Sequence, residues 1–368
     1  MSSLCVAEIN LPNIGHNLLQ VRNRAPGRKV MVAVKANAYG HGLVPVAKYL
    51  EAQGVDFLAV AFDTEGVELR KNGIRIPILV LTAVSDYEDL LKYGLTPNVY
   101  SFDSLKELKK ALQGTRKKIP VHLDIDTGMG RVGFRPDEAA RAVESILSDR
   151  DMTLEGVFTH LSSSDDPRDP YTRKQLDLFD GVLRLLRSKG SEPPLIHAAN
   201  SGGLFNHPRS HFNMVRPGIT VYGCPPDNGP PSGLDLRPAL SLKTSIFNIK
   251  TVDRPTGIGY NHTFTARKGQ VIATIPVGYG DGFNRLLSNR GRAIVEGHWA
   301  PIVGRISMDQ TTLNVTAAPR ARLGSEVVLI GGSGTKSITA GEIAKLTSTI
   351  SYEVLCGLSP RVQRIYLE

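Results

Sequence analysis

Short apolar runs alternate with segments of helical period over the first two-thirds of the chain. The runs have the length and content of buried strands, and there are eight: Val30 to Val34, Phe57 to Ala61, Ile76 to Leu81, Thr96 to Tyr100, Val121 to Ile125, Leu154 to Thr159, Leu195 to Ala199, and Asn213 to Arg216. Helical patterns lie between most of them, among them Leu43 to Gln53, Thr64 to Lys71, Ser104 to Leu112, Asp137 to Leu147 and Thr172 to Ser188. Eight strands alternating with helices predict an α/β fold, a parallel (β/α)8 barrel of the TIM type.

The pattern changes after Gly223 to Pro238, a segment rich in Pro, Gly and Asp that is typical of a linker or long loop. Short strand-like runs with Gly and Pro between them follow: Ser241 to Val252, Val271 to Pro276, Ala293 to Val295, Thr311 to Val315, and Glu326 to Ile330. They predict a mainly β C-terminal domain. One short helix is predicted over Thr339 to Leu346 with Thr339 as its N-cap, and another begins near Ser351.

Composition and charge change this picture little. The chain has 368 residues, of which 41% are hydrophobic, so it can bury a sizeable core. Lys and Arg outnumber Asp and Glu by 44 to 35, a net charge of +9, but they are dispersed, and the densest cluster is the short Arg116 to Lys118. Steering of an anionic substrate or cofactor therefore explains the charge better than nucleic-acid binding does.

Cysteines and the N-terminus bear on the compartment. Cys5, Cys224 and Cys356 are far apart and odd in number, so they predict neither a disulfide framework nor a zinc site. The first residues lack the basic and apolar regions of a signal peptide, and no run of about 18 apolar residues occurs. We therefore expect a cytoplasmic protein with no metal, no membrane partner and no nucleic-acid partner.

The first apolar run ends in a lysine, Lys35, followed by Ala-Asn-Ala-Tyr-Gly-His-Gly. A lysine at the mouth of a buried strand is costly unless it is paired or has reacted. One chemistry uses such a lysine, namely a Schiff base to an aldehyde cofactor, for which an amine of lowered pKa is the nucleophile. The simpler interpretation is a side chain that extends out of the barrel end. The string VKANAYGHG resembles the cofactor-lysine motif of the alanine racemases, which bind pyridoxal phosphate, and this favours the Schiff base.

Two loops suit the phosphate of such a cofactor. Barrel enzymes work at the C-terminal ends of their strands and often hold phosphate after strands 7 and 8. There the chain has Asn200-Ser201-Gly202-Gly203 and Arg216-Pro217-Gly218-Ile219. A serine hydroxyl and unhindered glycine amides are good donors to phosphate oxygens. Ordinary strand-to-helix turns are the alternative, but Lys35 on the adjacent first strand supports a phosphate site.

Arg216 is the candidate partner of the pyridine nitrogen, where pyridoxal enzymes place an acid or an arginine. An arginine stays charged and cannot accept a proton, so the nitrogen should stay unprotonated. Delocalisation of a carbanion into the ring would then weaken, and return of the α-proton would compete better against transamination. A surface salt bridge is the alternative, and the apolar strand before Arg216 argues against it.

Other motifs of the alanine racemases follow in the family's order. His122 to Gly133 resembles the DTGMGR motif, and the resemblance implies that Arg131 contacts the cofactor or the substrate carboxylate. Period 2 places His122, Asp124 and Asp126 on one strand face. Many members carry a carbamylated lysine at the position of Asp124. An aspartate supplies an anion without modification, though its stem is shorter, which leaves its direct reach to Arg131 in question.

The β domain supplies the second catalytic motif, Gly257-Ile-Gly-Tyr-Asn-His-Thr-Phe264, in which Tyr260 matches the family's tyrosine. A tyrosine has a reference pKa of about 10, so it needs a positive or hydrogen-bonded environment to act as a base near neutrality. Ser307 stands where a cysteine is frequent. The resemblance further implies cofactor contacts by Tyr39, His160, Asn200, Ser201, Arg216, Gly218, Ile219 and Tyr352, a substrate pocket with Arg131, Met308 and Asp309, and an entrance corridor with Tyr279, Arg285, Arg305 and Ile350.

The resemblance covers nearly the whole chain and implies an alanine racemase that makes D-alanine for peptidoglycan. Two bases would act on opposite faces of the substrate, Lys35 for the D isomer and Tyr260 for the L isomer. It also implies a homodimer in which Tyr260 reaches the partner's site, and an N-terminal strand, near Val6 to Leu11, that joins the β domain. The expected division is 1–12 for that strand, 13–235 for the barrel and 236–368 for the β domain.

Two alternatives stay open. One is another pyridoxal-phosphate amino-acid racemase or decarboxylase of the same architecture. Decarboxylases carry a different lysine string and an acid on the pyridine nitrogen, which Arg216 opposes. The other is a non-catalytic pyridoxal-phosphate carrier protein. Such carriers are single barrels, and the β domain with Tyr260 argues against that assignment.

Overall fold

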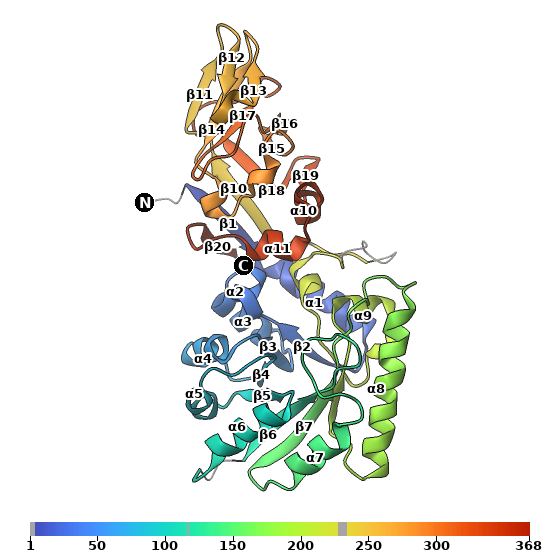
Figure 1. Cartoon of the computed structure of the whole chain (residues 1–368). Helices are drawn as coiled ribbons and strands as arrows, with labels where there is room; N and C mark the ends of the chain where they lie inside the picture. Colours follow the sequence, from blue (N-terminus) through green and yellow to red (C-terminus); the bar gives the residue numbers. More distant parts are fainter. Residues whose placement is uncertain (1–3, 116–117, 227–233) are drawn as a thin grey trace.

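A computed structural model describes residues 4–115, 118–226 and 234–368 of the chain. Arg116 and Lys117, the core of the short basic cluster, and the middle of the segment Gly223 to Pro238 lie outside these residues. The described part forms a barrel (lower half of Figure 1) and an elongated β domain that stands on one end of it.

The predicted barrel is confirmed. Eight parallel strands pair in sequence order, and the last pairs with the first to close the barrel. They are β2 (Lys29–Ala33), β3 (Phe57–Val60), β4 (Ile78–Val80), β5 (Thr96–Val99), β6 (Ile119–Asp124), β7 (Met152–Phe158), β8 (Leu195–His197) and β9 (Met214–Val215). The helices around and between them are α1 (Leu11–Arg24), α2 (Lys35–Tyr39), α3 (Leu43–Ala52), α4 (Asp63–Lys71), α5 (Tyr87–Lys92), α6 (Phe102–Leu112), α7 (Ala139–Leu147), α8 (Pro170–Ser188), α9 (Ser201–Asn206), η1 (Pro208–Ser210) and η2 (Ile219–Tyr222).

Burial on both faces explains why the barrel strands are continuous apolar runs. Along β2, Val30 and Val32 pack in the large core cluster that includes the helices, whereas Met31 belongs to a small cluster with residues of other barrel strands. Successive side chains of a strand point to opposite faces. Beyond the exposed Lys29, neither face of β2 meets water, and Lys35 follows directly at the C-terminal end of this buried strand.

The β domain is built of three sheets. The largest has the order β16-β15-β18-β10-β1-β20, with β19 beside β18; β11-β14-β17 and β12-β13 form the others. The strands are β1 (Cys5–Asn10), β10 (Leu240–Ser245), β11 (Asn248–Thr251), β12 (Thr256–Ile258), β13 (Phe264–Ala266), β14 (Val271–Ile275), β15 (Arg292–Val295), β16 (His298–Pro301), β17 (Thr311–Asn314), β18 (Glu326–Ser333), β19 (Lys336–Ile338) and β20 (Gln363–Leu367). The N-terminal strand β1 lies between β10 and β20. The domain boundaries after residues 12 and 235 stay a prediction.

Two further details of this domain concern the sequence pattern. The run Ser241 to Val252, expected as one strand, is two, because the chain leaves the large sheet after β10 and enters the three-stranded sheet at β11. Ile246 is buried and Phe247 exposed at the crossing. The predicted helix α10 (Ala340–Thr347) is confirmed together with its cap, since the Thr339 side chain accepts from the N–H of Glu342. Helix α11 (Ser351–Cys356) begins where a helix was expected.

The barrel and the β domain meet where α11 packs on α2. Gly40 follows α2 with a φ of +83°, and a Cβ there would lie 2.1 Å from the carbonyl oxygen of Leu355. Only glycine permits this approach. The β domain is thereby seated directly over the turn that follows Lys35.

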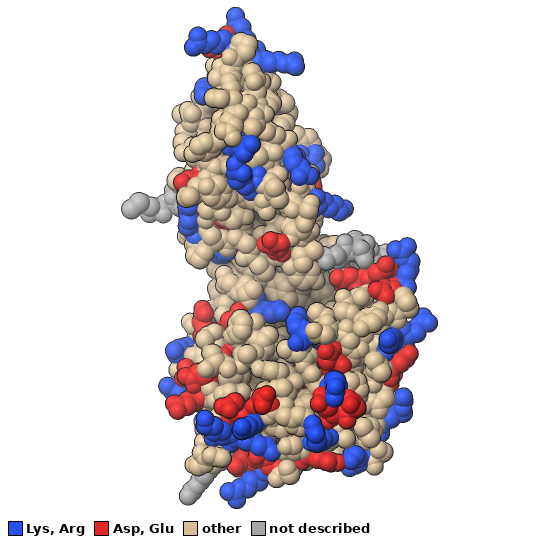
Figure 2. Space-filling model, in the orientation of Figure 1, with Lys and Arg blue, Asp and Glu red and all other residues tan. Residues whose placement is uncertain are grey.

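Charge is distributed differently over the two parts. Acidic and basic side chains mix over the barrel, whereas the visible face of the β domain carries mostly basic ones, several of them at its tip (Figure 2). No helix within the described ranges has both the length and the apolar character that crossing a bilayer requires.

Candidate functional site

Lys35 stands at the C-terminal mouth of the barrel, directly after β2. The backbone around it is fixed by bonds to both neighbouring strands: Val34 N donates to Ala59 O at 2.8 Å, and Ala33 N donates to Pro217 O at 3.1 Å. The Lys35 side chain is partly buried. Burial lowers its pKa, the positive charge of Arg131 lowers it further, and the Glu65 carboxylate opposes this. A lysine with a lowered pKa is more often a neutral amine, as a nucleophile or base must be.

The turn after Lys35 is left-handed. Four consecutive residues, Ala36 to Tyr39, have φ between 52° and 56°, a conformation that costs about 1–2 kcal/mol for each residue with a side chain. Surrounding bonds hold it. Ala36 N donates to Glu65 Oε1 at 2.7 Å, and the ring Nδ1–H of buried His41 donates to the carbonyls of Ala38 and Tyr39 at 3.1 and 2.9 Å. The strained turn carries Tyr39 back toward Lys35.

A pocket of about 420 Å³ opens beside Lys35 and gathers the predicted cofactor residues together with Arg131 of the predicted substrate pocket. The cofactor residues are Lys35, Tyr39, His160, Asn200, Ser201, Arg216, Gly218, Ile219 and Tyr352. Asp124 lines it too. The residues come from the ends of several barrel strands and from α11, so the pocket is made by both parts of the chain.

Arg216 is buried rather than on the surface, and its guanidinium plane is fixed by hydrogen bonds. Nη1 donates to Nδ1 and to the carbonyl of His197 at 2.7 and 2.9 Å, while Nη2 donates to Thr159 O at 2.9 Å and lies 3.5 Å from His160 Nδ1. Its Cζ lies 5.0 Å from the centre of the Phe158 ring. Burial lowers the pKa of Arg216 to about 10, so it is charged at neutral pH. The side chain presents a fixed positive charge to the pocket.

His160 stays neutral beside this charge. Burial, followed by the positive charges of Arg216, Arg131 and Lys35, lowers the pKa of His160 to about 3. A neutral imidazole can accept a hydrogen bond at one nitrogen and donate at the other. His160 can therefore sit between cationic side chains without adding to their repulsion.

Asp124 differs from the sequence expectation. An unmodified anion was expected, but burial raises the pKa of Asp124 to about 7, so a large share of the side chain is protonated near neutrality. Arg216 and Arg131 lower this pKa only in part. Asp124 Oδ2 accepts from Asn98 Nδ2 at 3.3 Å. Within the described residues no hydrogen bond joins Asp124 to Arg131, so the shorter stem supplies no direct contact here.

Asp126 does not share the pocket with Asp124. It follows the end of β6 and accepts from the N–H groups of Gly128 and Gly130 at 2.8 and 3.1 Å. These bonds fold the Thr127 to Gly130 loop that carries Arg131 to the pocket mouth. Arg131 is exposed.

The two candidate phosphate loops lie side by side. Ser201 Oγ accepts from Gly218 N at 3.0 Å and lies 3.1 Å from Thr220 Oγ1. A Cβ on Gly218 would lie 2.7 Å from the hydroxyl oxygen of Tyr39. The absence of a side chain at Gly218 therefore lets the Tyr39 hydroxyl lie close to the backbone of the second loop.

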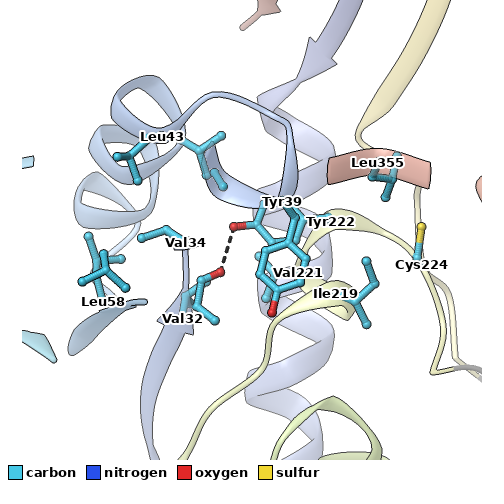
Figure 3. Packing of buried hydrophobic residues seen from close by; sticks show 14 of the residues in the cluster. Val32, Val34, Tyr39, Leu43, Leu58, Ile219, Val221, Tyr222, Cys224 and Leu355 are labelled. Atoms are coloured by element: carbon cyan, nitrogen blue, oxygen red, sulfur yellow. Dashed lines mark hydrogen bonds between the residues drawn. The ribbon is translucent and has the colours of Figure 1, made fainter. Parts of the chain in front are cut away.

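Aromatic rings form the wall between this pocket and the β domain. Tyr39 and Tyr222 stack with their ring centres 5.0 Å apart (Figure 3). The ring centre of Tyr352, on α11, lies 5.9 Å from that of Tyr39. The Tyr222 hydroxyl donates to Ala33 O at 2.9 Å. Ile219 and Leu355 pack close to these rings. The wall ties the end of β2 to α11.

The second set of predicted residues lies elsewhere. Tyr260 is on the short helix η3 (Tyr260–His262) of the β domain and is 68% exposed. It borders a separate surface hollow with Arg305 and Ser307, which does not include Lys35. Met308 is exposed as well, and Asp309 pairs with Arg361 at 2.8 Å. One chain therefore does not bring these residues to Lys35.

The predicted corridor residues are also on the surface. Tyr279 on η4 (Tyr279–Asp281), Arg285 on η5 (Arg285–Leu287) and Ile350 are exposed, and Arg305 is partly so. Ile350 caps α11, the helix that carries Tyr352, but it is not among the residues that line the Lys35 pocket. Ile350 borders a larger hollow of about 640 Å³ between η2 and α10. That hollow has mainly apolar walls and contains none of the predicted cofactor residues, so we place the site at the smaller pocket.

The structure adds residues that the sequence did not single out. Leu81, Thr82, Phe158 and Cys356 also line the pocket. The first three lie at or just beyond the ends of barrel strands, and this position is the signal that could have found them. Cys356 lines the pocket because α11 packs on α2, and no local sequence pattern predicts that packing.

Comparisons with known proteins agree with this geometry. The family model described as "Alanine racemase, N-terminal domain" matches residues 9–226, and "Alanine racemase, C-terminal domain" matches residues 239–366. The chain is 44% identical over 364 residues to alanine racemase 2 of Caldanaerobacter subterraneus, covering 98% of this chain and 94% of that protein. It is 43% identical over 363 residues to alanine racemase of Halothermothrix orenii, covering 98% and 96%.

Solved structures match over the whole chain. The alanine racemase of Clostridium difficile has a TM-score of 0.94 at 38% identity, covering 100% of this chain and 97% of that one. The same enzyme in complex with cycloserine has a TM-score of 0.89 at 38% identity, covering 100% and 96%.

Proposed function

The chain belongs to the alanine racemase family, and from that premise we propose that it interconverts L-alanine and D-alanine with pyridoxal phosphate at the Lys35 pocket of a homodimer. It is thus an isomerase, and D-alanine for peptidoglycan is its expected product. The observation that carries the proposal is one pocket lined by a lysine of lowered pKa and a buried, hydrogen-bonded arginine. Lysine supplies the covalent anchor, and arginine faces the pyridine nitrogen.

The residues of the pocket fit pyridoxal phosphate. Lys35 is an amine suited to an aldehyde, and Ser201 and Ile219 offer a hydroxyl and a backbone donor to phosphate oxygens, beside Gly218, whose N–H donates to Ser201 Oγ. The approach of Gly218 to the Tyr39 hydroxyl leaves room for no side chain at that position. Tyr352 lines the same pocket and supplies a further hydroxyl. When bound, the cofactor supplies an aldehyde for the amine and a conjugated ring that draws electrons from the substrate's α-carbon.

Inversion of the α-carbon needs two acid–base groups on opposite faces. Lys35 is one, because its lowered pKa leaves more of the Nζ as the neutral amine that can accept a proton. Tyr260 is the second, and its hydroxyl exchanges the proton on the L face. Arg131 at the mouth binds the substrate carboxylate or the cofactor, and His160 lies between Arg216 and the second base. Arg216 keeps its protons at neutral pH and so does not protonate the ring nitrogen.

A homodimer supplies the second base. Tyr260, Met308 and Tyr279 are 68%, 53% and 43% exposed in one chain, which is unusual for a cluster of large apolar side chains. Docking the β domain of one subunit over the barrel mouth of the other would bury them and place Tyr260 of the partner subunit opposite Lys35. Such an interface is two-fold, so both sites form at once. The exposed corridor residues, Arg285, Arg305 and Ile350, would then line the approach of alanine.

Racemisation assays test the proposal. Purified protein should convert L-alanine to D-alanine and the reverse, and removal of pyridoxal phosphate should abolish both rates until it is added back. Borohydride should fix the cofactor to wild-type protein and not to Lys35→Ala, whose covalent anchor is missing. Lys35→Arg is the matched control, since it keeps the positive charge without a usable amine. Decarboxylation in place of racemisation, or covalent cofactor in Lys35→Ala, would refute the assignment.

A further inference from the structure

A chain of hydrogen bonds runs from Arg216 through two buried histidines to the partly exposed carboxylate of Glu155. Arg216 Nη1 lies 2.7 Å from His197 Nδ1, His197 Nε2 lies 2.8 Å from His122 Nδ1, and His122 Nε2 lies 3.2 Å from Glu155 Oε2. Both histidines are fully buried. The four residues come from β6, β7, β8 and the end of β9, which are consecutive in the barrel. Only Arg216 of the four lines the cofactor pocket.

The Glu155 end of this series of hydrogen bonds depends on an irregularity in the pairing of β6 with β7. β6 and β7 pair Val121 with Leu154 but His122 with Gly156, so Glu155 is the extra residue of a bulge. A bulge re-aims a side chain, and here the Glu155 carboxylate reaches the His122 ring. A Cβ on Gly156 would lie 2.6 Å from His122 Nδ1. The glycine therefore makes room for the imidazole that the glutamate binds.

The chemistry of the partners fixes the proton on each ring. A guanidinium only donates, so His197 Nδ1 must accept. Burial lowers the pKa of His197 well below its ordinary value, and burial lowers that of His122 in spite of the Glu155 carboxylate, which raises it; both shifts favour neutral rings. Neutral His197 then carries its proton on Nε2 and donates to His122 Nδ1. His122 in turn carries its proton on Nε2 and donates to Glu155.

We propose that Glu155 is a positioning residue for Arg216. As the terminal acceptor, its carboxylate selects the Nε2–H form of His122, which selects the same form of His197, which presents a lone pair to the guanidinium. Without that acceptor, His122 can place its proton on Nδ1, against the N–H of His197. His197 must then change its tautomer or its ring orientation, and Arg216 loses one of the hydrogen bonds that fix its plane, while its bonds to the carbonyls of His197 and Thr159 remain. This proposal rests on the proposed function, because it assigns a purpose to the orientation of Arg216.

Two substitutions separate positioning from folding. Glu155→Leu removes the acceptor, whereas Glu155→Gln keeps an oxygen that can accept from His122 without the charge. Thr153→Leu, at an exposed position of the same strand, is the matched control for an added apolar side chain. Nitrogen-15 NMR of histidine-labelled holoenzyme reads the protonated nitrogen of each ring directly. Turnover of alanine and the absorbance of the bound cofactor report on Arg216.

In wild type we expect both rings protonated on Nε2, and in Glu155→Gln the same pattern with turnover within about twofold. In Glu155→Leu we expect a changed His122 signal, a shifted cofactor absorbance, and a fall in kcat of about tenfold with little change in KM. That size is at the low end of what loss of an outer hydrogen-bond partner costs a metal-bound histidine. Unchanged tautomers and turnover in Glu155→Leu would overturn the proposal. The proposal would also be overturned if Glu155→Gln and Glu155→Leu lost turnover equally and in proportion to their loss of thermal stability. Wild-type protein without racemase activity would refute the proposed function instead, and the NMR result would still stand by itself.

Discussion

The backbone N–H of Ala36 donates to the carboxylate of Glu65 at 2.7 Å. The other carboxylate oxygen accepts from the N–H groups of Ala61 and Phe62 at 2.8 and 3.3 Å. Glu65 thus ties the left-handed turn after Lys35 to the end of β3. Its charge also raises the pKa of Lys35, against burial and Arg131. One side chain therefore affects both the shape of the turn and the proton affinity of the base.

Glu65→Gln should move the pH dependence of racemisation. Loss of the negative charge lowers the pKa of Lys35 further, so the neutral amine persists to lower pH. We expect the acidic limb of kcat for D-alanine, whose α-proton Lys35 removes, to shift toward lower pH, while the loss of charge-assisted bonds costs about 1–2 kcal/mol of stability. Rate profiles against pH for both enantiomers measure it. A limb that moves to higher pH would contradict the assignment of Lys35 as the titrating base.

Gly40→Ala should disturb the packing of the β domain on the turn after Lys35. A side chain there meets the Leu355 carbonyl at 2.1 Å and forces an L-residue to a φ of +83°. We expect a loss of about 2 kcal/mol or more in unfolding free energy and weaker cofactor binding, because α11 carries Tyr352. Gly73→Ala is the matched control, since it has a φ of +91° with nothing within 4 Å of the added atom. Equal losses in the two variants, read by thermal unfolding, would show that backbone strain alone is at work.

Asp124→Asn should change how stability depends on pH. The native pKa of Asp124 is raised to about 7 from an ordinary value of 3.8. Between these values the folded protein binds more protons than the unfolded chain, so wild type loses stability as pH rises. Asparagine does not titrate. The difference in melting temperature, wild type minus variant, should therefore fall from about pH 4 to about pH 7 and stay level above. A difference that grows with pH would mean that native Asp124 is a stable anion.

Tyr260→Phe should affect the two enantiomers differently in proton exchange. Racemisation must fall in both directions, by about a hundredfold or more for a deleted general base, because the equilibrium constant between enantiomers is one. Lys35 can still remove the α-proton of D-alanine. We therefore expect solvent deuterium to enter D-alanine with retention and L-alanine far more slowly. Equal residual exchange, followed by NMR, would assign both faces to a single base.

The sequence predicts the barrel well because each strand is buried on both faces and stands out as an apolar run. The ends of those runs then give most of the pocket, including Lys35, Asn200, Ser201 and Arg216. The sequence does not show the left-handed turn, since alanine and tyrosine do not favour positive φ and the turn is held by contacts that include those with Glu65 and His41. It does not separate β10 from β11 either, because the division depends on which sheet each half joins.

Electrostatics and assembly are also beyond the local pattern. Asp124 is an ordinary carboxylate in the sequence, and its burial raises its pKa against the hydrogen bond from Asn98, which lowers it. In the sequence Glu155 is one more strand residue, and its place in a bulge is visible only from the register of β6 and β7. Tyr260 matches a catalytic motif, yet in a single chain it lies on the surface, outside the pocket that contains Lys35.

A mixed dimer tests most directly whether each site takes Lys35 from one subunit and Tyr260 from the other. Lys35→Ala and Tyr260→Phe proteins, each nearly inactive, are unfolded together and refolded, or coexpressed with different tags. In a two-fold dimer, one site of each mixed pair is then intact and the other lacks both bases. Random pairing should restore about one quarter of wild-type racemisation per subunit, and purified mixed dimers about one half. Activity no greater than the sum of the two parent proteins, in verified mixed dimers, would contradict a site shared between subunits.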